Sequence, residues 1–212
     1  MKNGLFISLL LALLLSGPVF AEGITAESMQ GLGREAASGD TGAIDKIGQA
    51  YDELFKNIDY QKEGVRVRSN YALMNAAFDV IGKSVKGNDT ADPAFRSLVY
   101  ALGKPTLGRF TVMPFGTAAA VGHQPSLDVL AHYKEHGMLL STVVLAMQAT
   151  ALNNNKEAVD FLVTVINDES VKPLWSEASQ GLVTAATQGN DEAKTAIAKA
   201  RAYAASRGGS SY

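Results

Sequence analysis

Apolar residues recur at helical spacing along most of the chain. The clearest stretch is 156–167, where the apolar positions fall on one side of a 3.6-residue helix: Ala158, Val159, Phe161, Leu162, Val165 and Ile166. Strict alternation of apolar and polar residues, which would indicate a strand, is scarce. Only 109–115 could pass for a strand, and Pro114 weakens that interpretation. The pattern predicts an all-α fold.

Polar turn clusters separate the helical stretches: Gly39-Asp40, Gly87-Asn88-Asp89, Gly122-His123-Gln124-Pro125, Asn153-Asn154-Asn155 and Gly189-Asn190-Asp191. They recur at intervals of roughly 30–50 residues, the length of a two-helix repeat. The predicted pairs are 25–38 with 41–57, 64–86 with 92–102, 106–121 with 125–135, 138–152 with 156–167, and 170–188 with 190–206. Since one helix pair cannot bury its apolar side alone, we predict an α-solenoid of about five stacked pairs. An irregular multi-helix bundle is the alternative.

Two segments resemble a known repeat class. Val65-Arg66-Val67-Arg68 leads into Tyr71-Ala72-Leu73, and Leu174-Trp175-Ser176-Glu177-Ala178 leads into Gly181-Leu182-Val183. On the strength of these segments, the chain resembles the HEAT or armadillo-like superfamily of helical repeats. The resemblance covers most of 23–206. The regular Asp and Arg ladder of a consensus HEAT array is absent. The resemblance implies HEAT-like helix pairs and an extended surface for partners.

The first 21 residues have the three parts of a secretory signal. A positive start at Lys2 is followed by the apolar run 5–15, a Gly17-Pro18 break and a small residue, Ala21, at the expected cleavage site. A bilayer-spanning helix needs about 20 apolar residues, more than this run contains. We therefore predict a signal peptide over 1–21, a single helical-repeat domain over 22–206 and a flexible tail over 207–212. The expected location is secreted or periplasmic, with no stable membrane span after cleavage.

Composition narrows the function classes. The 212 residues include no cysteine, 19 basic and 21 acidic residues, for a net charge of −2, and 47% are hydrophobic. These values argue against a disulfide-stapled mini-protein, a basic nucleic-acid-binding protein and an intrinsically disordered chain. There is no thiol nucleophile and no Gly-x-Ser-x-Gly elbow. We expect no cofactor and no nucleic-acid partner.

One short motif has the spelling of an inverted zinc protease site. His132 and His136 are four residues apart, so on a helix they would share one side and could hold a metal ion, with Glu135 as general base. Gly137 follows immediately and is typical of a helix end. The favoured interpretation is therefore two solvated histidines at a helix C-terminus and no metal site, with a metal-dependent hydrolase as the alternative.

The segment 103–116 is unusual because glycines and two prolines interrupt apolar and aromatic residues. It could be an exposed apolar binding loop or the proline-kinked first helix of the central repeat. The second interpretation is favoured because Phe and Val are more often buried than displayed. If the segment is displayed, its candidate binding residues are Arg109, Phe110, Met113 and Phe115.

These observations predict a non-enzymatic, secreted or periplasmic scaffold that binds a protein or peptide partner. Stacked helix pairs offer an extended surface, and no set of catalytic residues stands out. A structural role in an envelope complex is a further alternative to the metal-dependent hydrolase.

Overall fold

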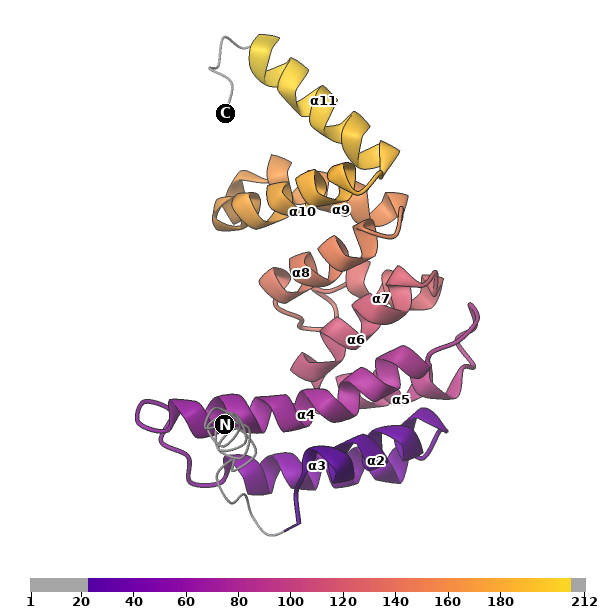
Figure 1. Ribbon diagram of the computed structural model, residues 1–212, viewed down its shortest axis with the longest axis vertical. Helices are drawn as coiled ribbons and strands as arrows, with labels where there is room; N and C mark the ends of the chain where they lie inside the picture. The colour runs from indigo at the N-terminus through magenta and orange to yellow at the C-terminus, as the bar shows by residue number, and fades with distance from the viewer. Residues whose placement is uncertain (1–22, 207–212) are drawn as a thin grey trace, which may run out of the picture.

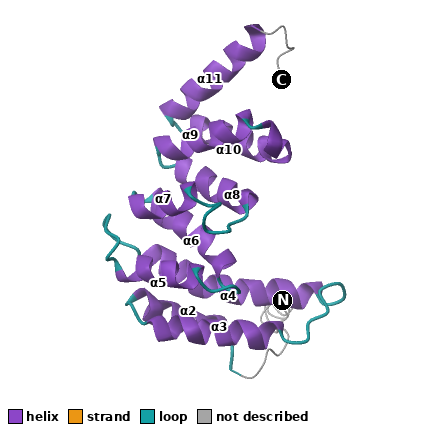
Figure 2. Ribbon diagram, turned by 180° about the vertical axis from the view of Figure 1, so that it is seen from behind, coloured by secondary structure: helices purple, strands orange, loops and turns teal. Residues whose placement is uncertain are grey.

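The computed structural model describes residues 23–206, and every regular element in this range is a helix (Figure 2). The all-α prediction is confirmed for this part of the chain. The helices are α2 (Ala26–Ala37), α3 (Thr41–Phe55), α4 (Gly64–Ser84), α5 (Pro93–Leu102), α6 (Gly108–Ala120), α7 (Gln124–Ala131), α8 (Leu140–Ala151), α9 (Lys156–Asn167), the 3-10 helix η1 (Glu169–Leu174), α10 (Trp175–Thr187) and α11 (Asp191–Ser206). The expected signal peptide and C-terminal tail lie outside the described residues.

The helices follow one another along the long axis of the molecule, from α2 and α3 at one end to α11 at the other (Figure 1). The even-numbered helices α2, α4, α6, α8 and α10 form one row, in which each packs on the next. The odd-numbered helices α3, α5, α7, α9 and α11 form a second row, and each packs against at least one neighbouring even-numbered helix. The hydrophobic core runs between the two rows.

Glycines allow close backbone contact within the even-numbered row. A Cβ atom placed on any of four helical glycines would lie less than 3.0 Å from the next helix: Gly33 against Ala77, Gly82 against Pro114, Gly116 against Ala146, and Gly181 against Gln148. One such contact lies at each of the four junctions, between α2 and α4, α4 and α6, α6 and α8, and α8 and α10. At Gly33, Gly82 and Gly116 the close atoms include backbone of the neighbouring helix, so a larger side chain would push that helix away, whereas at Gly181 they all belong to the Gln148 side chain.

A polar side chain caps the first turn of every odd-numbered helix. The caps accept hydrogen bonds from backbone N–H groups: Asp40 from Gly42, Asp92 from Phe95, His123 from Ser126, Asn155 from Ala158, and Asn190 from Ala193. Such caps satisfy N–H groups that have no partner inside the helix. The predicted polar turn clusters thus mark real helix starts.

Two of these caps also join the helix pairs to one another. Asn190 Nδ2 donates to the carbonyl oxygen of Ala151 at 2.7 Å, and His123 Nε2 lies 3.3 Å from the carbonyl oxygen of Asp89. Asn190 and His123 are both buried. Each therefore links the start of its helix to the pair before it.

The structure corrects three details of the predicted elements. The stretch 109–115 is helical because it lies in α6, so the strand interpretation is wrong. The predicted helix 125–135 ends already at Ala131. The predicted helix 170–188 is two elements, the 3-10 helix η1 and then α10, because Pro173 interrupts the α-helical hydrogen bonding.

Within residues 23–206, no helix combines the length and apolar character required to cross a membrane.

Candidate functional site

The segment 103–116 forms a turn followed by most of α6, which begins at Gly108 and contains Pro114. Of the two sequence interpretations, the structure agrees with a helix that contains a proline and not with an exposed loop. Phe115 is fully buried and packs against Phe95, with ring centroids 6.0 Å apart. The candidate binding residue Phe115 is therefore part of the core and is not displayed to a partner.

Arg109 and Phe110 belong instead to an aromatic cluster that joins three helices. The cluster consists of Arg109 and four rings: Tyr51 and Phe55 from α3, Tyr71 from α4, and Phe110 from α6. Ring centroids are 4.5 Å apart for Tyr51 and Phe55, and 5.6 Å apart for Tyr71 and Phe110. We refer to these five residues as the Arg109 cluster.

The tyrosine hydroxyls hold the Arg109 guanidinium in place. Arg109 Nη1 donates to the hydroxyl of Tyr71 at 2.9 Å, and Nη2 donates to the hydroxyl of Tyr51. The guanidinium carbon lies 5.2 Å from the ring centre of Tyr51 and 5.4 Å from those of Tyr71 and Phe110. At this range the cation is attracted to the faces of the rings.

The positive charge of Arg109 is not neutralised by its neighbours. No ion pair among the described residues includes Arg109. Burial raises the pKa of Tyr51 above its usual value, although the Arg109 guanidinium opposes the shift, so this hydroxyl stays neutral at physiological pH. Arg109 is also exposed. It therefore presents a fixed, uncompensated cation to solvent.

A groove lies beside the Arg109 cluster, between α4 and α6. Its volume is about 370 Å³, and its lining residues are Asn75, Ala76, Phe78, Asp79, Phe110, Met113, Pro114 and Thr117. We call it the α4–α6 groove. Met113, one of the predicted binding residues, is 45% exposed in its wall. Asp79 provides the one ionisable group of the lining and pairs with Lys83 at 2.6 Å.

Arg109 lies next to this groove, although it lines the second cavity described below and not the groove itself. Arg109, Met113 and Thr117 are spaced by four residues on α6, so they share one side of that helix. The first α6 residue of the lining is Phe110, which directly follows Arg109, and the first α4 residue is Asn75, one helical turn after Tyr71. The Arg109–Tyr71 hydrogen bond connects α6 to α4 at this end.

The exposed side of the even-numbered row is almost free of charge from α6 onward. Helix α8 contains no Asp, Glu, Lys or Arg, while α6 contains only Arg109 and α10 only Glu177. Helices α6 and α8 each have a neighbour in their row on either side and the odd-numbered row behind them, so their solvent-exposed residues share the remaining side, whereas α10 is the last helix of its row. Met113 and Leu145 are exposed there, at 45% and 50%, while Val183 on α10 is 52% exposed at the end of the row. We call this surface the uncharged face.

The structure removes the geometric basis of the zinc hypothesis. Helix α7 ends at Ala131, before His132, and the segment 132–137 forms turns. His132 and His136 therefore do not share one side of a helix, and His132 Nδ1 is 2.8 Å from the carbonyl oxygen of Asp128. Among the residues that the structure describes, no three His, Asp or Glu side chains come together as a possible metal site.

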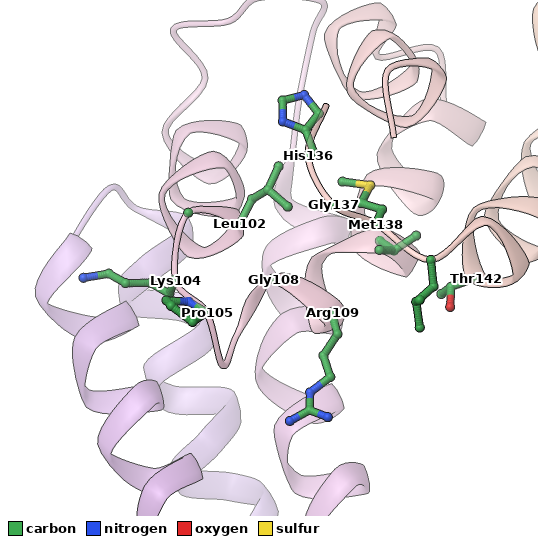
Figure 3. Close-up of a pocket in the computed structure, with 12 residues that line it drawn as sticks. Leu102, Lys104, Pro105, Gly108, Arg109, His136, Gly137, Met138 and Thr142 are labelled. Atoms are coloured by element: carbon green, nitrogen blue, oxygen red, sulfur yellow. The ribbon is translucent and has the colours of Figure 1, made fainter. Parts of the chain in front are cut away.

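A second cavity, of about 280 Å³, lies between the α5–α6 turn and the segment leading into α8. Lys104, Arg109 and His136 are among its lining residues. Figure 3 shows the side chains of Lys104 and Arg109 extending away from His136. The Lys104 ammonium pairs with Asp45 at 2.9 Å. The basic groups do not converge, and we assign no chemistry to this cavity.

We compared the chain with protein-family models, with curated proteins and with solved structures, and none of them matches it. The functional argument therefore depends on the geometry of this chain alone.

Sequence reasoning missed the two tyrosines that position Arg109. Tyr51 and Tyr71 are 58 and 38 residues from Arg109 in the chain. Tyr51 has the helical spacing of a core residue, and nothing in its local sequence distinguishes it. Only the packing of α3, α4 and α6 brings the three side chains together.

Proposed function

We propose that this protein is a non-enzymatic scaffold that works outside the cytoplasm, in the periplasm or as a secreted protein. It binds a protein or peptide partner through the uncharged face and the adjoining α4–α6 groove. The observation that carries this proposal is the exposure of apolar side chains on three consecutive helices that contain almost no charge.

The proposal includes an α-solenoid of HEAT-like helix pairs. Its support is the order of the contacts, in which each helix packs on its near neighbours in the chain and helices distant in sequence stay apart. Repeated caps at Asp40, His123, Asn155 and Asn190 add to this support, since they give four hairpins the same construction. Stacked pairs of this kind present extended surfaces that suit protein partners.

Apolar exposure on the uncharged face favours a docking role. Isolated exposed apolar residues are common on soluble proteins, whereas contiguous apolar patches mark interaction sites. Met113 and Leu145 come from adjacent helices of one row and lie on the same exposed side of it. Among the odd-numbered helices, α3, α9 and α11 carry several charged residues each, whereas α5 and α7 carry one each, Arg96 and Asp128.

Site-specific photo-crosslinking in the cells that produce the protein tests this proposal. A photoreactive phenylalanine derivative is placed at Leu145 on the uncharged face or, as the matched control, at Val99 on α5. Val99 is also apolar and is 44% exposed. We expect a discrete crosslinked protein from position 145 and none from position 99. Equal crosslinking at both positions, or none at either, would contradict the proposal.

Mass spectrometry of the protein isolated from its native compartment tests the proposed location. Signal cleavage after Ala21 predicts a chain that begins at Glu22 and is recovered with the periplasmic or extracellular fraction. Replacement of Leu10 by Arg interrupts the apolar run and is expected to leave the full-length chain in the cytoplasm. An intact N-terminus on the native protein would contradict secretion.

A further inference from the structure

We propose that the α4–α6 groove binds the C-terminal end of an apolar peptide segment and that Arg109 binds its terminal carboxylate. This inference rests on the proposed function and gives the partner a chemistry. It follows from the position of one uncompensated cation next to a groove that is itself nearly neutral.

The chemistry of Arg109 suits a carboxylate. A guanidinium has five N–H donors in one plane and binds a carboxylate through two parallel hydrogen bonds. Hydrogen bonds to Tyr51 and Tyr71 use only part of this capacity. Because the two hydroxyls already fix the guanidinium, a ligand does not have to order a mobile side chain.

The groove suits the apolar residues that precede the carboxylate. Phe78, Phe110, Met113 and Pro114 provide an apolar lining. Its one acidic residue, Asp79, is paired with Lys83, so no free carboxylate of the lining competes for Arg109. The apolar side chains of the segment would displace water from this lining, which is the main source of affinity in such grooves.

A chain end fits this arrangement better than an internal acidic residue. The lining of the groove on α6 stops at Phe110, so Arg109 is the next side chain beyond it on this helix. A segment that lies along the groove and ends there places its last carboxylate beside Arg109. An internal acidic residue would require the chain to continue past the Arg109–Tyr71 hydrogen bond, which joins the two walls.

Two forms of one peptide test this assignment. The probe is acetyl-Ala-Val-Leu-Ala-Leu with either a free terminal carboxylate or a terminal amide, titrated into the mature protein labelled at its methionine methyl groups. The methyl signal of Met113 reports occupancy of the groove. We expect the carboxylate form to shift this signal and to bind about tenfold tighter than the amide, as one charge-assisted hydrogen-bonding contact predicts.

Variants locate the carboxylate contact. Arg109→Gln is expected to lower the affinity of the carboxylate form to that of the amide. Arg96→Gln, which changes an exposed arginine on α5, is the matched control and should keep the tenfold ratio. Tyr71→Phe keeps the ring and removes one hydroxyl. It should therefore lower the ratio of the carboxylate affinity to the amide affinity, while the protein stays folded. Thermal unfolding checks that each variant is folded.

The inference is overturned if the amide binds as tightly as the carboxylate, if neither form shifts the Met113 signal, or if Arg96→Gln acts like Arg109→Gln. Its failure can be separated from that of the proposed function. A protein that crosslinks through position 145 and binds both peptide forms alike would keep the scaffold and lose the carboxylate site.

Discussion

The two rows of helices begin and pack in different ways. Every odd-numbered helix starts with a polar side chain that caps its first turn, such as Asp40 on α3 or Asn155 on α9. By contrast, α6, α8 and α10 start at Leu107, Leu139 and Leu174, none of which provides a side-chain cap. In the even-numbered row only α2 has a capped start, because Thr25 and Ser28 form a capping box. The odd-numbered row therefore takes its helix starts from local chemistry, whereas α4, α6, α8 and α10 depend on packing against their neighbours.

The packing of the even-numbered row centres on glycines at each junction. Gly82 brings α4 against Pro114 of α6, and Gly116 brings α6 against Ala146 of α8. Glycine lowers the intrinsic stability of a helix by about 1 kcal/mol relative to alanine. The close contact between helices must offset that cost. In this row the glycines therefore lower the intrinsic stability of each helix and permit closer van der Waals contact between neighbouring helices.

The largest expected effect comes from filling one of these junctions. We expect Gly82→Ala to lower the free energy of unfolding by about 1–3 kcal/mol, because the new Cβ would lie 2.7 Å from Pro114 Cα. Gly48→Ala on α3 is the matched control. A Cβ at Gly48 would be 3.8 Å from Leu107 Cδ1, so this change should raise the free energy of unfolding by about 0.5–1 kcal/mol. Urea denaturation measures the free energy of unfolding of both variants. If both substitutions changed it in the same direction, the proposed difference in packing between the two rows would be wrong.

The next effect tests the caps of the odd-numbered row. Asn190→Ala removes the cap of Ala193 and the side-chain donor to the carbonyl oxygen of Ala151, which keeps only the backbone N–H of Asn154 at 3.2 Å. We expect a loss of about 1–3 kcal/mol in the free energy of unfolding. Asp40→Ala removes an exposed cap that joins no other helix pair and should cost about 1 kcal/mol. Equal losses in chemical denaturation would mean that the link to Ala151 adds nothing.

The difference between the rows also explains which elements the sequence predicts well. Predicted starts at 41, 92, 125, 156 and 190 agree with the observed odd-numbered helices to within one residue, because each cap is a local signal. The predicted starts at 25 and 64 agree with α2 and α4 to within one residue, although only α2 has a side-chain cap. Predicted starts at 106, 138 and 170 are early by two residues or more, because nothing polar marks Gly108, Leu140 or Trp175. The same reason hides the site, since Tyr51 and Tyr71 reach Arg109 only through the packing of three helices.

A smaller effect is expected from a substitution that gives α8, an even-numbered helix, a side-chain cap. Leu139 precedes α8 with φ −73° and ψ 123°, the extended backbone of an N-cap residue, and it is 69% exposed. We expect Leu139→Asp to raise the free energy of unfolding by about 0.5–1 kcal/mol, through hydrogen bonds to the first turn and attraction to the helix dipole. Leu139→Ala should change it by less than about 0.5 kcal/mol. A thermal shift for Ala as large as that for Asp would assign the gain to lost apolar exposure instead.

The smallest effect concerns the surface charges around the odd-numbered row. Asp45 on α3 accepts a hydrogen bond from Lys104, which lies 2.9 Å away, and this contact holds the pKa of Asp45 below its usual value. The pair therefore adds stability above the unfolded pKa of Asp45, and the contribution disappears as the pH falls through the lower folded value. Hydrogen bonds with Tyr100 and Asp45 raise the pKa of Lys104, so at the alkaline end the contribution persists until this group titrates. Both side chains are well exposed, so the effect should be slight and should shrink in high salt.

Lys104→Met removes this pair, and its thermal unfolding should be compared with that of the unchanged protein at pH 7 and pH 3. A small difference in Tm at pH 7 that fades at pH 3 and in 1 M salt is the expected result. Lys83→Met is the matched control, because Lys83 pairs with Asp79 on the same helix and spans no junction. If Lys104→Met lowered stability as much as Gly82→Ala, surface charge would have to join backbone contact as a determinant of how the helix pairs stack.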